Sequence, residues 1–270
     1  MVIDLKVNEI ANLGSNVKTM IKNENCSVLM MSDATGEGIM TVYRVMPGVM
    51  ICFSDMHMEK CDSEFELRKD KKVLCIDHCR EGRIEMEVQP GVFSIMQENE
   101  LRLDNRENHK GTTYYPLRHY HGVSVFMDVE ETQKALDTMF HGFSVNIAEL
   151  RTRYCTQDKP YVIRNDEGLS RIISSFYQRN IERPEVSAAK EYYQIKVVEM
   201  LLYLEAMTVE NSREIKPYYY KTQMEKIKAV HARITGDLKT RLTIEDLSSM
   251  YDIPATTMKK CFKDVYGDSI

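Results

Sequence analysis

The chain has 270 residues, of which 43% are apolar and 29% charged, and its net charge is −5. These values are typical of a soluble protein with one large domain or two. No stretch approaches the roughly 20 apolar residues that span a bilayer, and the N-terminus lacks the basic and apolar segments of a secretory signal. The seven cysteines have no small-domain spacing, so we expect reduced thiols in a cytoplasmic protein that does not enter a membrane.

The first half of the chain predicts mainly β structure. Residues 5–22 are partly amphipathic and predict one or two short helices. Between residues 26 and 128, short apolar runs alternate with turn residues, as in an antiparallel sandwich or barrel. The runs begin at Cys26, Ile39, Val49, Lys72, Arg83, Gly91 and His121. In the run that begins at Arg83, Glu85 and Glu87 alternate with apolar residues, which predicts a strand with one wet face.

After Asp128 the apolar period becomes helical. We expect helices over residues 130–139, 146–153, 167–179, 187–207 and 222–235. Asn146 and Asp166 are suitable N-caps, and Gly236 is suitable just after the last helix. The helix at 187–207 has an apolar stripe that predicts either core packing or a dimer face. The stripe consists of Ala189, Tyr193, Val197, Met200, Leu201 and Leu204.

The last thirty residues, RLTIEDLSSMYDIPATTMKKCFKDVYGDSI, predict two short helices joined by a turn. Thr243 caps the first helix, and Asp252-Ile253-Pro254 separates it from the second. The second helix has an apolar side and a polar side. The apolar side consists of Met258, Cys261, Phe262 and Val265, and the polar side of Thr256, Lys259, Lys260 and Lys263.

This plan fits a helix-turn-helix that reads DNA, and an ordinary helical hairpin with a solvated lysine face is the alternative. Residues 221–267 carry a net positive charge in a chain that is negative overall. A basic tail behind an acidic body suits a protein whose tail meets phosphates.

The stretch LTIEDLSSMYDIPATTMKKCFKDVYG resembles the first helix-turn-helix of the AraC/XylS transcription regulators. Leu247 matches in the first helix, and Met258, Phe262, Lys263 and Gly267 follow the family's L-x-x-x-F-K-x-x-x-G spacing. Ser248 stands where the family usually has alanine, and Pro254-Ala255 where it often has Ser-Pro. Upstream, CREGRIEMEV and RHYHGVSVFMD are similar to the branch that contains siderophore-responsive regulators.

The resemblance implies a one-component regulator that is not an enzyme. It places Thr256, Lys259, Lys260 and Lys263 at the positions that face double-stranded DNA, and it implies an N-terminal region that binds a small-molecule effector, forms a homodimer, or both. The family reads DNA with two such modules, whereas only three residues follow Gly267. We therefore expect a chain without the second helix-turn-helix: a fragment, a truncated product, or a protein that binds DNA only as a dimer.

Together these features predict an α+β protein with three parts. An N-terminal antiparallel β-rich, sandwich- or barrel-like sensor domain leads into a helical subdomain, and a C-terminal all-α helix-turn-helix module follows. The expected boundaries are 1–210 for the sensor region, 211–221 for a linker and 222–270 for the module. Within the sensor region, residues 26–128 are β-rich and 129–207 helical.

Two further groups of residues are candidates for binding sites. Arg80, Arg83, Tyr114 and Arg118, with the neighbouring Tyr115, could line a pocket for an anionic or aromatic effector, or could lie on a solvated sheet face. His119 and His121, with His109, could bind a metal as in cupin barrels, but no carboxylate has the usual spacing. Cys75, Asp77 and Cys79 share a strand face, where cysteines more often pack as small apolar groups. No metal site and no cofactor are expected.

Two alternative functions stay open. One is a truncated regulator that binds effector or dimerises but binds DNA poorly, and acts by titrating a full-length partner. The other is a cupin-like metal-binding protein or enzyme with an incidental helical tail.

Overall fold

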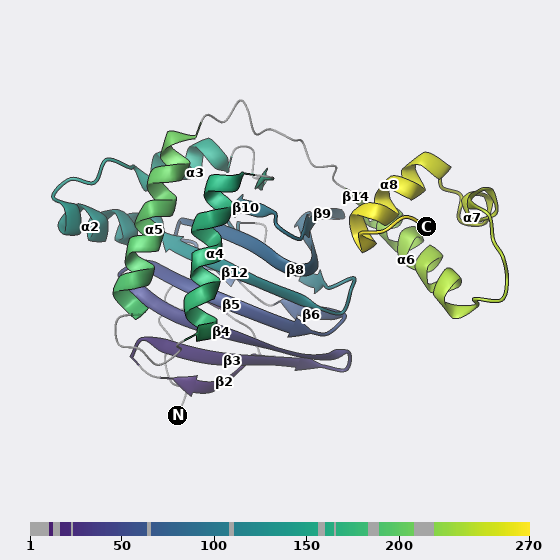
Figure 1. Cartoon of the computed structure of the whole chain (residues 1–270), viewed down its shortest axis with the longest axis horizontal. Coiled ribbons are helices and arrows are strands. Elements are labelled where there is room, and N and C mark those ends of the chain that lie inside the picture. Colours follow the sequence, from purple (N-terminus) through teal and green to yellow (C-terminus); the bar gives the residue numbers. More distant parts are fainter. Residues whose placement is uncertain are drawn as a thin grey trace.

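A computed structural model of the chain describes residues 11–12, 17–22, 24–63, 66–107, 111–155, 160–164, 166–182, 189–207 and 219–270. The fold is α+β, as predicted. Figure 1 shows a curled antiparallel sheet with one group of helices against one face and another group at the opposite end. No helix in the described ranges is long and apolar enough to cross a membrane.

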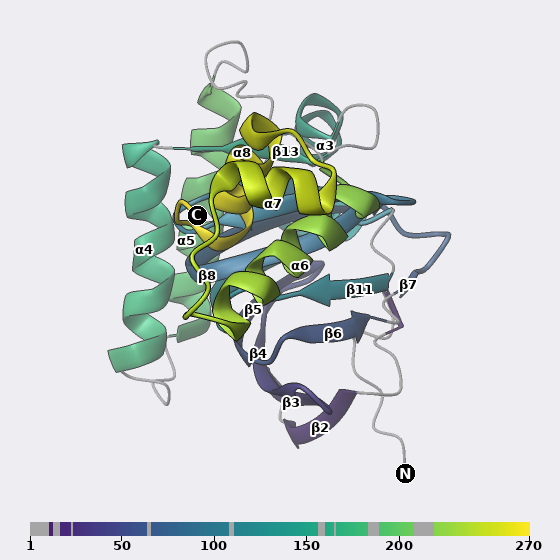
Figure 2. The ribbon, with the colours of Figure 1, turned by 90° about the vertical axis from the view of Figure 1, so that its right-hand side faces the viewer.

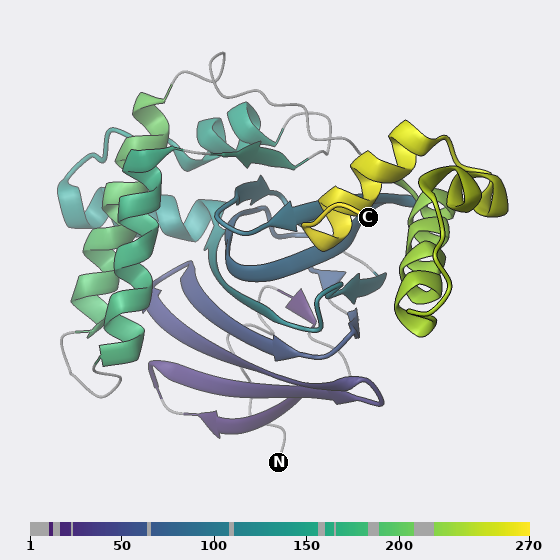
Figure 3. The same ribbon diagram turned by 45° about the vertical axis from the view of Figure 1, so that its right-hand side comes forward.

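The main sheet has the strand order β13-β10-β8-β12-β5-β4-β3-β2. Its strands are β2 (Val17–Lys22), β3 (Cys26–Asp33), β4 (Gly36–Met46), β5 (Val49–His57), β8 (Val73–Gln89), β10 (Leu101–Asp104), β12 (Tyr120–Asp128) and β13 (Tyr161–Ile163). The remaining short strands are β1 (Ala11–Asn12), β6 (Lys60–Ser63), β7 (Glu66–Leu67), β9 (Val92–Gln97), β11 (Gly111–Tyr114) and β14 (Tyr219–Tyr220). The curl of the sheet is clear in Figure 3.

Strand β8 is long enough to join both ends of the molecule. The sequence predicted two strands here, beginning at Lys72 and Arg83, and the structure makes them one. The first part of β8 pairs with β10 and β12, and the second part pairs with β9. Gly82 allows the bend between them: its φ is +82°, and a Cβ at this position would lie 2.1 Å from the carbonyl oxygen of His119.

The prediction of an N-terminal helix is wrong for those of its residues that the structure describes. Residues 17–22 form β2, which pairs with β3. Val17, Thr19 and Ile21 are β-branched and alternate along the segment, so they favour a strand once a neighbouring strand is available. Residues 11–12 form β1, and the rest of the predicted helix lies outside the described residues.

Four helices cover one face of the sheet and build the main core with it. They are α2 (Val129–Phe140), α3 (Ile147–Tyr154), α4 (Glu167–Glu182) and α5 (Ala189–Ala206). The predicted caps are confirmed: the side chain of Asn146 accepts from two backbone N–H groups of α3, and Asp166 accepts from the N–H of Leu169 at 2.8 Å. The stripe on α5 is buried from Tyr193 to Leu204, so it packs within the monomer.

A buried charge network holds the centre of the sheet together. Asp77 on β8 lies 2.8 Å from the guanidinium of Arg102 and 2.5 Å from that of Arg106. The hydroxyl of Ser124 on β12 donates to the same carboxylate at 2.6 Å. Asp77 and both arginines are buried. The network therefore ties β8, β10 and β12 together where water cannot solvate the charges.

The C-terminal helices are α6 (Lys221–Gly236), α7 (Ile244–Tyr251) and α8 (Ala255–Tyr266). Their apolar side chains form one core with Phe93 and Ile95 of β9 and Tyr219 of β14. Figure 2 shows the three helices lying over the β8 end of the sheet. The sequence predicted that Gly236 follows the last helix residue, but in the structure Gly236 is itself the last residue of α6. The predicted linker lies outside the described residues except at its end, where Tyr219–Tyr220 pairs with β9.

Candidate nucleic-acid interface and ligand cleft

Local hydrogen bonds fix the start of α7, and a left-handed residue followed by a buried one makes the turn to α8. The Thr243 hydroxyl accepts from the N–H of Asp246 at 3.1 Å, and the Asp246 carboxylate accepts from the N–H of Thr243 at 2.9 Å. Asp252 ends α7 in the left-handed conformation, with a φ of 47°. Ile253 is buried, so the turn is anchored in the helical core. Pro254 stands at the N-cap of α8.

Helix α8 has the two faces that the sequence predicted. Met258, Cys261, Phe262 and Val265 are buried in the core. The opposite face is exposed and consists of Thr256, Lys259, Lys260 and Lys263. Because these four residues follow an i, i+3, i+4, i+7 spacing, they form one continuous stripe along the helix. Three ammonium groups and a hydroxyl in a row are suited to phosphate oxygens and base acceptors.

The end of α8 is tied to strands β8 and β9. The Arg83 guanidinium donates to the backbone carbonyl of Asp264 at 3.0 Å, and the Gln97 side chain donates to the same carbonyl at 3.3 Å. The Tyr219 hydroxyl donates to the Asp264 carboxylate. Gly267 leaves the helix with a φ of +90°, and a Cβ there would lie 2.5 Å from the Arg83 guanidinium. The positive φ favours glycine at position 267, and a larger residue there would have to displace the Arg83 guanidinium.

The strand face predicted to be wet is covered by helices. Glu85 is completely buried, because α6 lies over it. Its carboxylate lies 2.8 Å from the ammonium of Lys228, which also lies 3.5 Å from the ring centre of Tyr114. Burial raises the pKa of Glu85, and Lys228 opposes that shift. The prediction of a solvated face was wrong because α6, which covers Glu85, begins more than 130 residues further along the chain.

We expect Lys228→Met to loosen the contact between α6 and β8. The substitution leaves the Glu85 carboxylate buried without its cation, and we expect a cost of about 1–3 kcal/mol, reduced by the partial exposure of Lys228. Hydrogen exchange of the α6 and α8 amides should become faster. Lys221→Met, on an exposed position of the same helix, is the matched control. Equal exchange in the two variants would contradict this role of Lys228.

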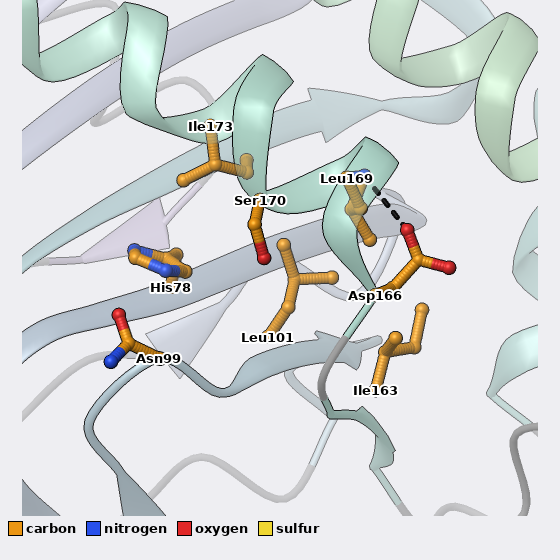
Figure 4. A pocket seen from close by; sticks show the side chains of 8 residues that line it. All are labelled: His78, Asn99, Leu101, Ile163, Asp166, Leu169, Ser170 and Ile173. Atoms are coloured by element: carbon orange, nitrogen blue, oxygen red, sulfur yellow. Dashed lines mark hydrogen bonds between the residues drawn. The ribbon is translucent and has the colours of Figure 1, made fainter.

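A cleft of about 490 Å³ opens between the bend of β8, the β9–β10 turn and α4. It is lined by His78, Arg80, Glu81, Glu98, Asn99, Ser170, Ser174, Tyr177 and Gln178. A smaller hollow adjoins it, and there the side chains of His78, Asn99 and Ser170 lie around Leu101 (Figure 4). The volume of the cleft is in the range of small-molecule sites.

The cleft holds an imidazole and a guanidinium beside the carboxylates of Glu81 and Glu98. Burial, with the nearby charge of Arg80, lowers the pKa of His78 to about 4, so its imidazole is neutral at pH 7. Its Nδ1 lies 3.0 Å from the Tyr177 hydroxyl. The Arg80 guanidinium stacks 5.0 Å from the Tyr177 ring centre. Among the described atoms, its Nη1 is buried without a hydrogen-bond partner. A carboxylate or similar group could accept from it.

The structure does not bring the predicted effector residues together. Arg80 lines the cleft, whereas Arg83 and Tyr114 lie beneath the C-terminal helices. Arg118 is exposed and pairs with Glu59 at 3.1 Å. The sequence analysis missed His78 and Tyr177. Tyr177 comes from α4, and no local pattern in the sequence indicates that it meets β8.

The cleft and α8 are held by the same two strands. Arg80 lies in the cleft three positions before Arg83 on β8, and Glu98 lies in the cleft directly after Gln97 of β9. Arg83 and Gln97 are the residues that bond to Asp264 of α8. A displacement of these strand segments by a ligand would therefore reach the contacts that hold α8.

Comparison with known proteins gives no family assignment. No protein-family model matches the sequence, and no curated protein matches it. Among solved structures, the AraC-like transcriptional activator CuxR is similar over 92% of this chain and 80% of its own, with 13% identity and a TM-score of 0.38. ToxT from Vibrio cholerae is similar over 82% of this chain and 76% of its own, with 9% identity and a TM-score of 0.32. Vicilin from hazelnut, Corylus avellana, is similar over 62% of this chain and 52% of its own, with 10% identity and a TM-score of 0.22. Superpositions this loose carry no weight for function, which has to be inferred from the residues and contacts of the chain itself.

Proposed function

We propose that this protein is an effector-responsive, sequence-specific DNA-binding transcription regulator of the AraC type. Residues 222–270 form the helix-turn-helix module, and residues 1–210 form the sensor region. Helix α8 enters the major groove, and its lysine stripe contacts phosphates and base edges. No catalytic step is proposed.

The observation that supports this function is the two-sided character of α8. Its buried face packs on α6, α7 and β9, and its exposed face carries Lys259, Lys260 and Lys263 behind Thr256. The module is preceded by an N-capped α7 and a tight turn with a buried isoleucine. An ordinary helical hairpin can fold without a fixed turn and without an uninterrupted cationic stripe, so their combination favours a DNA-binding role.

The effector would bind in the cleft beside Arg80. Its acidic group would accept hydrogen bonds from the buried Nη1 of Arg80, which is otherwise unpaired among the described atoms. A bound ligand would shift the β8 and β9 segments whose next residues hold Asp264. The effector would thus change how α8 is held, and with it the affinity for the operator.

Selection from random-sequence duplexes tests the proposal. The purified chain is incubated with the pool, and bound duplexes are recovered and sequenced over several rounds. We expect the recovered duplexes to share a sequence motif. Each module should account for the bases that one recognition helix can reach in the major groove. Recovery of duplexes with no sequence enrichment would leave only nonspecific phosphate contact and would overturn sequence-specific recognition.

A regulator that pairs with a partner but binds DNA poorly is a second candidate. Ile195 and Leu202 on α5 lie outside the buried stripe and are 66% and 44% exposed. They lie seven positions apart and share one face of the helix, as at a helix–helix contact. Sedimentation of the wild type and of Ile195→Lys would show whether this face forms a homodimer. A stable dimer without duplex enrichment would favour the second candidate.

A further inference from the structure

Three strands bring histidine and carboxylate side chains together at one rim of the sheet. Asp55 and His57 lie two positions apart near the end of β5, so both point to the same side. His119 directly precedes β12, and Glu81 lies at the bend of β8. This group shares no residue with α8 or with the contacts that hold it.

The distances within this group are short. The Nε2 atom of His57 lies 3.0 Å from a carboxylate oxygen of Asp55, and the rings of His57 and His119 have their centres 5.2 Å apart. One ligand atom from each of Asp55, His57 and His119 lies within 4.8 Å of the others. The Nε2 atom of His119 lies 3.5 Å from a carboxylate oxygen of Glu81.

Backbone geometry produces this convergence. Gly82 has a positive φ, and its missing Cβ lets β8 approach the backbone of His119 directly. The approach places Glu81 opposite the start of β12. The sequence analysis set the histidines aside because no carboxylate had a suitable spacing. The carboxylates come instead from two neighbouring strands.

We propose that Asp55, His57 and His119, with Glu81 as a fourth donor, form a binding site for a divalent transition metal ion such as Zn²⁺. Two imidazole nitrogens and two carboxylate oxygens are a donor set that suits Zn²⁺ and its neighbours, and not Mg²⁺ or Ca²⁺, which take oxygen donors. Donors at 2.0–2.2 Å from Zn²⁺ are about 3.4 Å apart in a tetrahedron, so the wider separations in the group, which reach at most 4.8 Å, have to shrink by up to about 1.4 Å. Asp55 and His57 are more than half exposed, so their side chains have room to move.

The site also adjoins the ligand cleft. Glu81 lines the cleft, and its carboxylate lies 3.4 Å from Arg80. A metal ion that takes Glu81 as a ligand would withdraw this partner from Arg80. The ion would therefore leave the guanidinium more available to an anionic ligand in the cleft.

Titration of the metal-free, reduced chain with Co²⁺ tests the site. Co²⁺ substitutes for Zn²⁺, and its visible spectrum separates histidine and carboxylate ligation from ligation by thiolates. This separation matters because the chain has seven cysteines, none of which forms a disulfide among the described residues. We expect one ion per chain, with no thiolate-to-metal charge-transfer absorption.

The variants then assign the ligands. His57→Ala and His119→Ala should each weaken Co²⁺ binding at least about tenfold, and Asp55→Asn should weaken it in the same direction. His141→Asn is the matched control: His141 is an exposed histidine in the left-handed region, which asparagine tolerates, and its loss should change nothing. Circular dichroism without metal checks that each variant folds. No binding, a thiolate band, or equal binding by wild type, His57→Ala and His119→Ala would overturn the proposal.

Discussion

Asp77→Asn should be the most destabilising single substitution among the charged residues of the sheet. It removes the carboxylate that faces Arg102 and Arg106, both of which are buried. Arg102 then stays in the core without its anion, and Arg106 keeps only Asp104, at 3.2 Å. Removing one partner of a buried ion pair costs about 3–5 kcal/mol, which is a large share of the stability of a typical domain. Urea denaturation should show a correspondingly lower midpoint.

The same network predicts the pH dependence of stability. Burial alone raises the pKa of Asp77, but Arg106 and Arg102 outweigh it, so the net shift is downward. A carboxyl group with a lowered pKa in the folded state binds fewer protons there than in the unfolded state. Its contribution is therefore complete above about pH 4, the ordinary pKa of aspartate, and is lost as the pH falls below it. The difference between wild type and Asp77→Asn should shrink in the same range.

Asp70→Asn is the control for this prediction. Asp70 is exposed and pairs with Arg68 at 3.2 Å on the surface, where solvent screens the ion pair and leaves it little effect on stability. Its urea midpoint should be close to that of the wild type. If Asp77→Asn also unfolds at the wild-type midpoint, the buried network does not hold the sheet together.

How far the sequence predicts this fold depends on where the contacts come from. The faces of α8 follow from helical periodicity alone, because Met258 and Phe262 are set against Lys259 and Lys263 within one element. Asn146 and Asp166 were identified as caps for the same reason. Membership of the AraC/XylS family, and of a branch within it, by contrast, stays a prediction.

Contacts between distant elements could not be predicted. Glu85 has the spacing of a solvated strand residue, and only the docking of α6 buries it. The cleft combines β8 with Tyr177 of α4, about a hundred residues later. The rim cluster joins His57 and His119 through the bend at Gly82, and no spacing in the sequence shows that bend.

The second large effect should follow from removing the lysine stripe of α8. Lys259, Lys260 and Lys263 are exposed, so the triple alanine variant should fold as the wild type does. Each phosphate contact contributes about 0.9 to the slope of log K against log salt. Three lost contacts should lower that slope by about 2.7 and weaken binding roughly 100-fold at 0.15 M salt. Fluorescence anisotropy with a duplex from the random-sequence selection, at several salt concentrations, measures both quantities.

A triple variant with the same change in charge is the control. Lys69, Lys72 and Lys134 are exposed and do not belong to the C-terminal helices. Their replacement by alanine should leave the salt slope nearly unchanged. Equal slopes in the two triple variants would mean that the chain attracts DNA by its overall charge and not through α8.

Photo-crosslinking tests most directly whether the exposed face of α8 lies against DNA. A photoreactive amino acid is placed at position 260 in one protein and at position 134 in another, and each is irradiated with a selected duplex. We expect a covalent protein–DNA adduct from position 260 and none from position 134. A duplex that is bound but yields no adduct at position 260 would contradict the placement of α8 in the groove.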